Sequence, residues 1–125
     1  MKVPAYIPGV CNIGKGEVRQ RLAVGWACLA VTLLMFWLLR YSTLSPAWNL
    51  LIALPAAASA LGFLQGFLHF CAAFGLAGMY NVLTSAGTTE SVDNAVYRAQ
   101  DRSKAVRIIV YSVLIGIGVS LLSYL

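Results

Sequence analysis

Three long stretches of the chain are apolar and almost uncharged, at residues 22–40, 46–83 and about 105–125, and polar residues gather between them. The hydrocarbon core of a bilayer is about 30 Å thick, and a helix of about 20 residues crosses it. A chain of 125 residues, 60% hydrophobic and 10% charged, cannot hide that much apolar surface from water. The pattern therefore predicts an all-α integral membrane protein with transmembrane helices at about 20–41, 46–83 and 105–125.

The middle stretch is too long for a straight crossing, because a helix over 46–83 would extend roughly 55 Å. We predict one long, kinked or tilted crossing, broken near Pro55 or at Gly75 or Gly78, with a re-entrant piece as the alternative. Two short crossings stay open, but they would separate the basic N-terminus from the basic segment 98–107. The tendency of positive charge to stay on one side disfavours that arrangement.

The longest polar segment precedes the third stretch. Within it, Val92, Ala95, Val96 and Ala99 recur at helical spacing, which predicts an amphipathic juxtamembrane helix over about 91–104. Thr89 or Ser91 is the expected cap. Neither Pro nor Gly interrupts the passage into the third stretch, so we expect one continuous helix.

The first 16 residues are rich in Pro and Gly and predict an irregular N-terminal arm, followed by a single transmembrane helical domain over 17–125. Basic residues flank the first and third stretches, where they would bind anionic lipid head groups and hold the N-terminus on the cytoplasmic side and the C-terminus on the opposite side. These residues are Lys15, Arg19, Arg21, Arg98, Arg102, Lys104 and Arg107. The net charge of +5 lacks the interleaved aromatics typical of nucleic-acid binding, so no nucleic-acid partner is expected.

Small residues define two helix faces that we expect to be interfaces. On a helical wheel, Gln65 and His69 lie on the same side as three small residues, and small residues four apart let helix backbones approach closely. The predicted interface residues are Ala58, Gly62, Gln65, Gly66, His69, Ser112, Gly116 and Ser120. The two faces would dock on each other, within one chain as a hairpin or between chains as an oligomer.

His69 is the single histidine of the chain and the main candidate for chemistry. A histidine bonded within a helix interface is the simplest interpretation. Imidazole also ligates haem and related macrocycles, so a haem or a (bacterio)chlorophyll-type pigment with His69 as axial ligand is the alternative; proton relay or substrate contact is a third. The three cysteines have no metal-like spacing, and no metal site is expected.

A catalytic set is missing, since the chain has four acidic residues and one histidine. We therefore expect a non-enzymatic small polytopic subunit that packs laterally in a larger membrane complex, bioenergetic complexes included, with lipids and other transmembrane subunits or copies of itself as partners. The alternatives are a homo-oligomeric small channel or transporter, lined by Gln65, His69, Tyr80 and Asn81, and a cofactor-binding subunit that uses His69.

Overall fold

The structure is a computed structural model that describes residues 6–81 and 90–124, most of which are helical. Three of the described helical segments are long and apolar enough to span a membrane. They are α1 (Lys15–Arg40), the 3₁₀ helix η1 (Pro46–Ile52) continued by α2 (Ala53–Leu68), and α4 (Ala95–Leu122). The short elements between α2 and α4 are α3 (Ala72–Ala77), β1 (Met79–Tyr80) and β2 (Glu90–Ser91).

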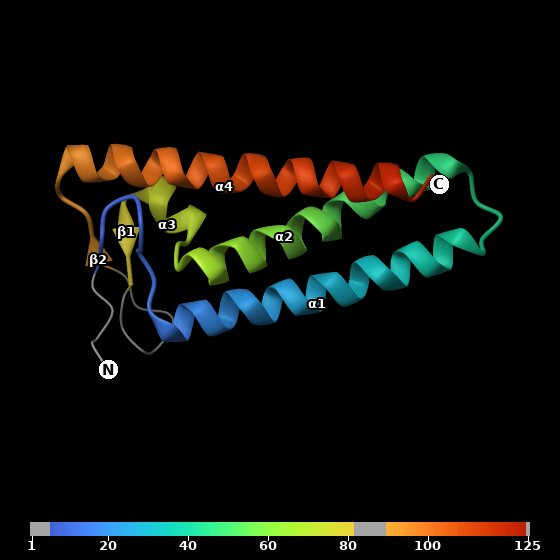
Figure 1. Cartoon of the computed structure of the whole chain (residues 1–125), viewed down its shortest axis with the longest axis horizontal. Coiled ribbons are helices and arrows are strands. Elements are labelled where there is room, and N and C mark those ends of the chain that lie inside the picture. Colours follow the sequence, from blue (N-terminus) through green and yellow to red (C-terminus); the bar gives the residue numbers. More distant parts are fainter. Residues whose placement is uncertain (1–5, 82–89, 125) are drawn as a thin grey trace.

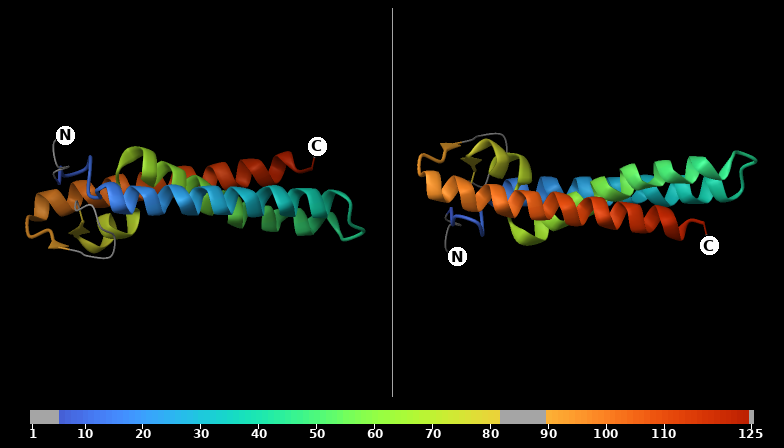
Figure 2. Two further views of the ribbon diagram at one scale, coloured as in Figure 1. Left: turned by 90° about the horizontal axis from the view of Figure 1, so that it is seen from below. Right: turned by 90° about the horizontal axis from the view of Figure 1, so that it is seen from above.

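The three long helices run side by side, with α2 between α1 and α4 (Figure 1). Figure 2 shows α1 and α4 on opposite sides of α2. The segment before α1, the short elements and the first turns of α4 gather at one end of the bundle, which we call the arm end, and the C-terminus lies toward the other (Figure 1). Lys15, Arg19 and Arg21 of α1 thus share this end with the basic residues of α4, whereas Arg40 lies at the other end of α1. The direction of the termini across a membrane stays a prediction.

The middle span is shorter than the predicted helix over 46–83. It ends at Leu68, and His69 follows in the left-handed conformation with φ 55° and ψ 41°. Of the expected places, Pro55 lies in the first turn of α2, where proline is tolerated, and Gly75 lies within the separate helix α3. Gly78, the third, does interrupt the chain, because it ends α3 in the left-handed conformation. Residues 82–83 of the expected helix lie outside the described residues.

The third span is one unbroken helix from the juxtamembrane segment onward, as expected. It begins at Ala95 because the side chain of Asn94 accepts hydrogen bonds from the backbone N–H groups of Val96 and Tyr97, at 2.9 and 3.3 Å. Of the caps we expected, Ser91 belongs to β2 and Thr89 lies outside the described residues. The predicted apolar face does not pack inside the chain at Val96, which is 64% exposed, and its contact with lipid stays a prediction.

Close backbone contacts hold α1 and α4 against α2. A Cβ added to Gly62 would lie 2.7 Å from the backbone nitrogen of Gly25 in α1, and the Ser59 hydroxyl donates to the Gly25 carbonyl oxygen at 2.8 Å. On the other side, a Cβ on Gly116 of α4 would lie 2.6 Å from the carbonyl oxygen of Ala53. The two predicted small-residue faces therefore do not dock on each other: the Gly62 face meets α1, and the Gly116 face meets a different side of α2.

The far end of the bundle is closed by hydrogen bonds between η1 and the end of α4. The Ser120 hydroxyl donates to the carbonyl oxygen of Asn49 at 2.9 Å, and the Tyr124 hydroxyl donates to the carbonyl oxygen of Pro46 at 2.9 Å. Ser45 caps η1, and Pro46 occupies its first turn, where its missing N–H costs nothing.

Candidate functional site

Residues 6–14, which we call the arm, contain no named helix or strand, and hydrogen bonds hold them against the rest of the chain. Asn12 of the arm is fully buried and binds the break that follows α2. The Asn12 side-chain amide donates to the carbonyl oxygen of Cys71 at 3.1 Å and accepts from the Cys71 N–H at 2.6 Å, while its own N–H donates to the His69 carbonyl oxygen at 3.1 Å. One asparagine thus supplies the hydrogen bonds that a continuing helix would have made.

Gln65 completes the break from the other side. Its side-chain oxygen accepts from the N–H of Ala72 at 2.8 Å, and its carbonyl oxygen accepts from the N–H of Phe70 at 3.0 Å. The first N–H groups of a helix lack partners inside the helix, so this side chain stabilises the start of α3. Gln65 is buried as expected, but its side-chain amide forms its hydrogen bond within the chain, at the break between α2 and α3.

A second asparagine joins the arm to the loop after α3. Asn81 and Asn12 are linked by a backbone hydrogen bond of 2.8 Å, and the Asn81 carbonyl oxygen accepts from the N–H of Gly14 at 2.8 Å. The Asn81 side chain donates to buried Glu17 at 3.3 Å. Glu17 also forms a salt bridge with Arg21 at 3.1 Å, and Arg21 extends to the sulfur of Cys71 at 3.1 Å.

The arm is anchored to α4 through Asp101, which is fully buried. The Tyr6 hydroxyl donates to one carboxylate oxygen at 2.5 Å, and the N–H of Gly9 donates to the other at 2.8 Å. Gly9 has a φ of 70°, a conformation that glycine adopts without strain, and this aims its N–H at Asp101. Burial and then the adjacent Asp101 carboxylate raise the pKa of Tyr6 well above its ordinary value. The Tyr6 ring also stacks on that of Tyr80, with centroids 4.6 Å apart.

His69 lies at an exposed turn and not within a helix interface, in contrast to the prediction. It is the only described non-glycine residue with a positive φ, and histidine is among the residues that tolerate this region better than most. In this structure His69 occupies the turn between α2 and α3. Its use as an axial ligand for a pigment stays untested.

The predicted head-group residues divide into two groups. Arg21 and Arg98 bind inside the chain, Arg98 through a hydrogen bond from its side chain to the carbonyl oxygen of Val92. Lys15, Arg19, Arg102 and Arg107 are exposed, and Lys104 is half-buried. The exposed members lie on the parts of α1 and α4 nearest the arm end.

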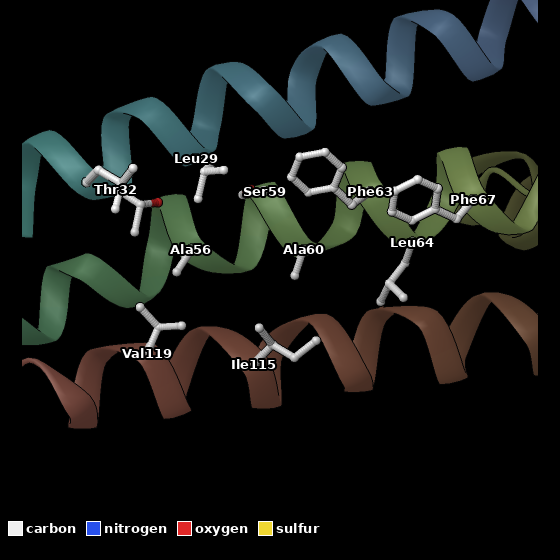
Figure 3. Close-up of a pocket in the computed structure, with 11 residues that line it drawn as sticks. Leu29, Thr32, Ala56, Ser59, Ala60, Phe63, Leu64, Phe67, Ile115 and Val119 are labelled. Carbon is white, nitrogen blue, oxygen red and sulfur yellow. The ribbon is translucent and has the colours of Figure 1, made fainter.

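An apolar groove of about 500 Å³ runs along α2 between α1 and α4, and we call it the lateral groove (Figure 3). Its floor on α2 consists of the small residues Ala56, Ser59 and Ala60. Larger side chains form its walls, from Leu29 on α1 to Ile115 on α4, and Phe63 and Phe67 line its arm-end portion. No pattern of residues indicates this groove, because its shape depends on the relative placement of three helices.

Comparison with protein-family models, with curated proteins and with solved structures finds no match to this chain. The hydrogen bonds and the titratable groups of the arm end are therefore the basis for assigning its role. Across residues 6–81 and 90–124, every buried side-chain nitrogen or oxygen has a hydrogen-bond partner. In the same residues, no three His, Cys, Asp or Glu side chains come together as a metal site would need. A satisfied network of this kind rigidifies the arm end.

Sequence reasoning missed Asn12 and Asp101 as members of this network. Asn12 is in a segment whose Pro and Gly content suggested irregular chain, and Asp101 is on a helix expected to be solvated on its polar face. The one available signal was the presence of Asn81 and Gln65 in an otherwise apolar stretch, since buried amides require partners.

Proposed function

We propose that this chain is a non-enzymatic membrane protein that packs laterally against transmembrane helices of other subunits, as a structural or accessory component of a larger membrane complex. The observation that carries the proposal is the lateral groove. Its floor is made of small side chains, and it opens on the flank of the bundle, where a neighbouring helix would lie.

Helix association in lipid depends on close packing, because lipid tails are as apolar as the helices themselves. The middle span uses small residues for this purpose on two sides: Gly62 meets α1, and Ala53 and Ala57 meet Gly116 of α4. Ala60, which is half-buried, presents the same kind of small side chain toward the lateral groove, on the flank of the bundle. A third helix against that side would repeat the packing already seen on the other two.

The hydrogen-bond network at the arm end also supports a structural role. Gln65 and Asn81 make their hydrogen bonds within the chain. Their use in holding the arm and α3 together favours a rigid platform over a polar conduction path. The outward sides of the helices, meanwhile, expose large apolar side chains such as Trp26, Leu33 and Leu114.

The test places tryptophan in the groove and at a matched position outside it. We expect Ala60→Trp to fill the groove and to reduce the native mass of the gently solubilised assembly to that of the free chain, with its helix content unchanged. Leu114→Trp, on an exposed side of α4 away from the groove, should leave the native mass as in the wild type. A wild-type chain that is monomeric in native membranes, by photo-crosslinking from Ala60, would contradict the proposal, and so would a discrete homo-oligomer unaffected by Ala60→Trp.

A further inference from the structure

A second cavity lies at the arm end, between the turn of the arm and one side of α4. It has a volume of about 470 Å³, and we call it the arm cleft. Pro8 and Gly9 form one wall, and Gln100, Ser103 and Arg107 of α4 line the other. The arm wall is held in place by the hydrogen bond from Gly9 to the buried carboxylate of Asp101. The cleft is therefore built by two segments that are 92 residues apart in sequence.

The polar side chains of the arm cleft are donors grouped around one cation. The Arg107 guanidinium lies 3.2 Å from the Ser103 hydroxyl, and Gln100 lies on the preceding turn of the same side of α4. Among the described residues no acidic side chain forms a salt bridge with Arg107. The one acidic residue of α4, Asp101, is fully buried and bound by Tyr6 and Gly9. An anion with several acceptor oxygens complements this set, because guanidinium binds phosphate in a two-pronged geometry.

The position of the cleft along α4 indicates where such an anion would come from. Arg107 is the last charged residue of the sequence, so the apolar part of the third span begins immediately after it. The head-group layer on each side of a bilayer is about 5–8 Å thick, and Gln100 to Arg107 covers about 10 Å of helix at 1.5 Å per residue. With the apolar part of α4 in the hydrocarbon, Arg107 and Ser103, which are about 6 Å apart along the helix at 1.5 Å per residue, would lie within that layer, where lipid phosphates are found.

We propose that the arm cleft binds the phosphate of an anionic phospholipid, with Arg107 and Ser103 as its ligands and Gln100 as a further donor. The acyl chains of the lipid then follow the apolar outer side of α4. The half-buried Lys104 raises the local positive potential and favours anionic over zwitterionic lipid. This site is independent of the lateral groove, since no residue lines both.

The test measures lipid retention by the purified full-length chain with native mass spectrometry. Phosphatidylglycerol and phosphatidylcholine are added in competition, and inorganic phosphate is added in a separate arm. We expect the wild type to retain phosphatidylglycerol preferentially. Arg107→Gln should weaken that preference at least about tenfold, because a charge-assisted hydrogen-bonding group is lost. Arg107→Lys, which keeps the charge but not the two-pronged geometry, should fall between the two.

The matched control is Arg102→Gln, which removes the same charge from an exposed residue that does not line the cleft. It should retain the wild-type preference within about threefold, since an exposed charge acts through a screened field. Equal losses in Arg107→Gln and Arg102→Gln would overturn the proposal in favour of general surface charge. Displacement of phosphatidylglycerol by inorganic phosphate at comparable concentration would overturn it in favour of a soluble phosphate ligand. Far-ultraviolet circular dichroism verifies that each variant is folded, and Ser103→Ala provides a second, milder loss of preference.

Discussion

Replacing Gly62 with alanine tests the close approach of α1 and α2. The added Cβ would lie 2.7–2.9 Å from three backbone atoms of α1, where ordinary van der Waals contact begins at 3.4 Å, so α1 must retreat by about 0.7 Å. The obstacle is the backbone of Gly25 and Arg21, which cannot rotate away as a side chain would. The hydrogen bond from Ser59 to the Gly25 carbonyl oxygen, at 2.8 Å, would lengthen with the same movement.

The expected magnitude follows from two opposing terms. Overpacking a close contact costs about 1–3 kcal/mol, and alanine recovers up to about 1 kcal/mol of helix propensity relative to glycine. We expect Gly62→Ala to lower the free energy of unfolding by about 1–2 kcal/mol. The measurement is reversible unfolding in mixed mild detergent and dodecyl sulfate, followed by far-ultraviolet circular dichroism.

Gly118→Ala is the matched control, because a Cβ at Gly118 meets nothing within 4 Å. It adds the same methyl group to a helix and should leave the free energy of unfolding unchanged or raise it by up to about 1 kcal/mol. If Gly62→Ala proves as stable as Gly118→Ala, the two helices do not touch through their backbones, and the reasoning on the packing of α2 is refuted.

Three further variants probe the arm end by the same unfolding assay or by titration. His69→Gly should be more stable than His69→Ala by about 1 kcal/mol, the reverse of the helical order, because only glycine is unstrained at positive φ; an alanine variant that is the more stable would mean that the helix continues through this position. Asn12→Ala should lower the free energy of unfolding by about 2–4 kcal/mol, because the Cys71 N–H and carbonyl groups are left buried without partners, and a change within about 0.5 kcal/mol would show that the arm does not bind there. Since the folded-state pKa of Tyr6 is raised above its ordinary value of 10.0, its contribution to stability is present below that pH and is lost as the pH rises further. Tyr6→Phe should therefore remove one late-titrating phenol from the ultraviolet absorbance titration and weaken the alkaline loss of stability, whereas loss of a phenol that titrates at the ordinary pH would show that Tyr6 is not held against Asp101.

The helical character and the three long apolar helices followed from the sequence, because the length of an apolar run is itself the signal for a span. The break in the middle span at His69 could not be predicted from the sequence. The residues around it are as apolar as those on either side, and the groups that replace the helix hydrogen bonds come from Asn12, which is 59 positions away from Cys71. The residues around the break do not indicate a partner so distant in the sequence.

The small-residue faces of α2 and α4 could be recognised because their small residues are four positions apart. That spacing does not indicate which helix packs against each face. Gly62 was expected against Gly116 and instead meets Gly25, a residue that stands alone in the apolar run of α1. The middle span carries small residues on several sides, so it can receive α1 on one and α4 on another. Only the three-dimensional arrangement decides which pair forms.

The burial of Asp101 is a third feature that could not be predicted from the sequence. On a helical segment with polar neighbours, an aspartate is expected in water. Its burial depends on the arm, which brings a tyrosine hydroxyl and a glycine N–H to its two oxygens. The hydrogen-bond donors and the acceptor belong to the two ends of the sequence, and neither end alone reveals the pairing.

The separation between the arm and its anchors also constrains biosynthesis. Tyr6 and Asn12 are translated first, yet their partners Cys71 and Asp101 follow 59 to 95 residues later. Asn12 therefore finds its partners once α3 has emerged, whereas Tyr6 and Gly9 lack theirs until Asp101 of α4 has left the ribosome. Chains that lack α4 would leave Tyr6 and Gly9 unbound, which makes protease resistance of residues 6–9 a natural marker of a completed bundle.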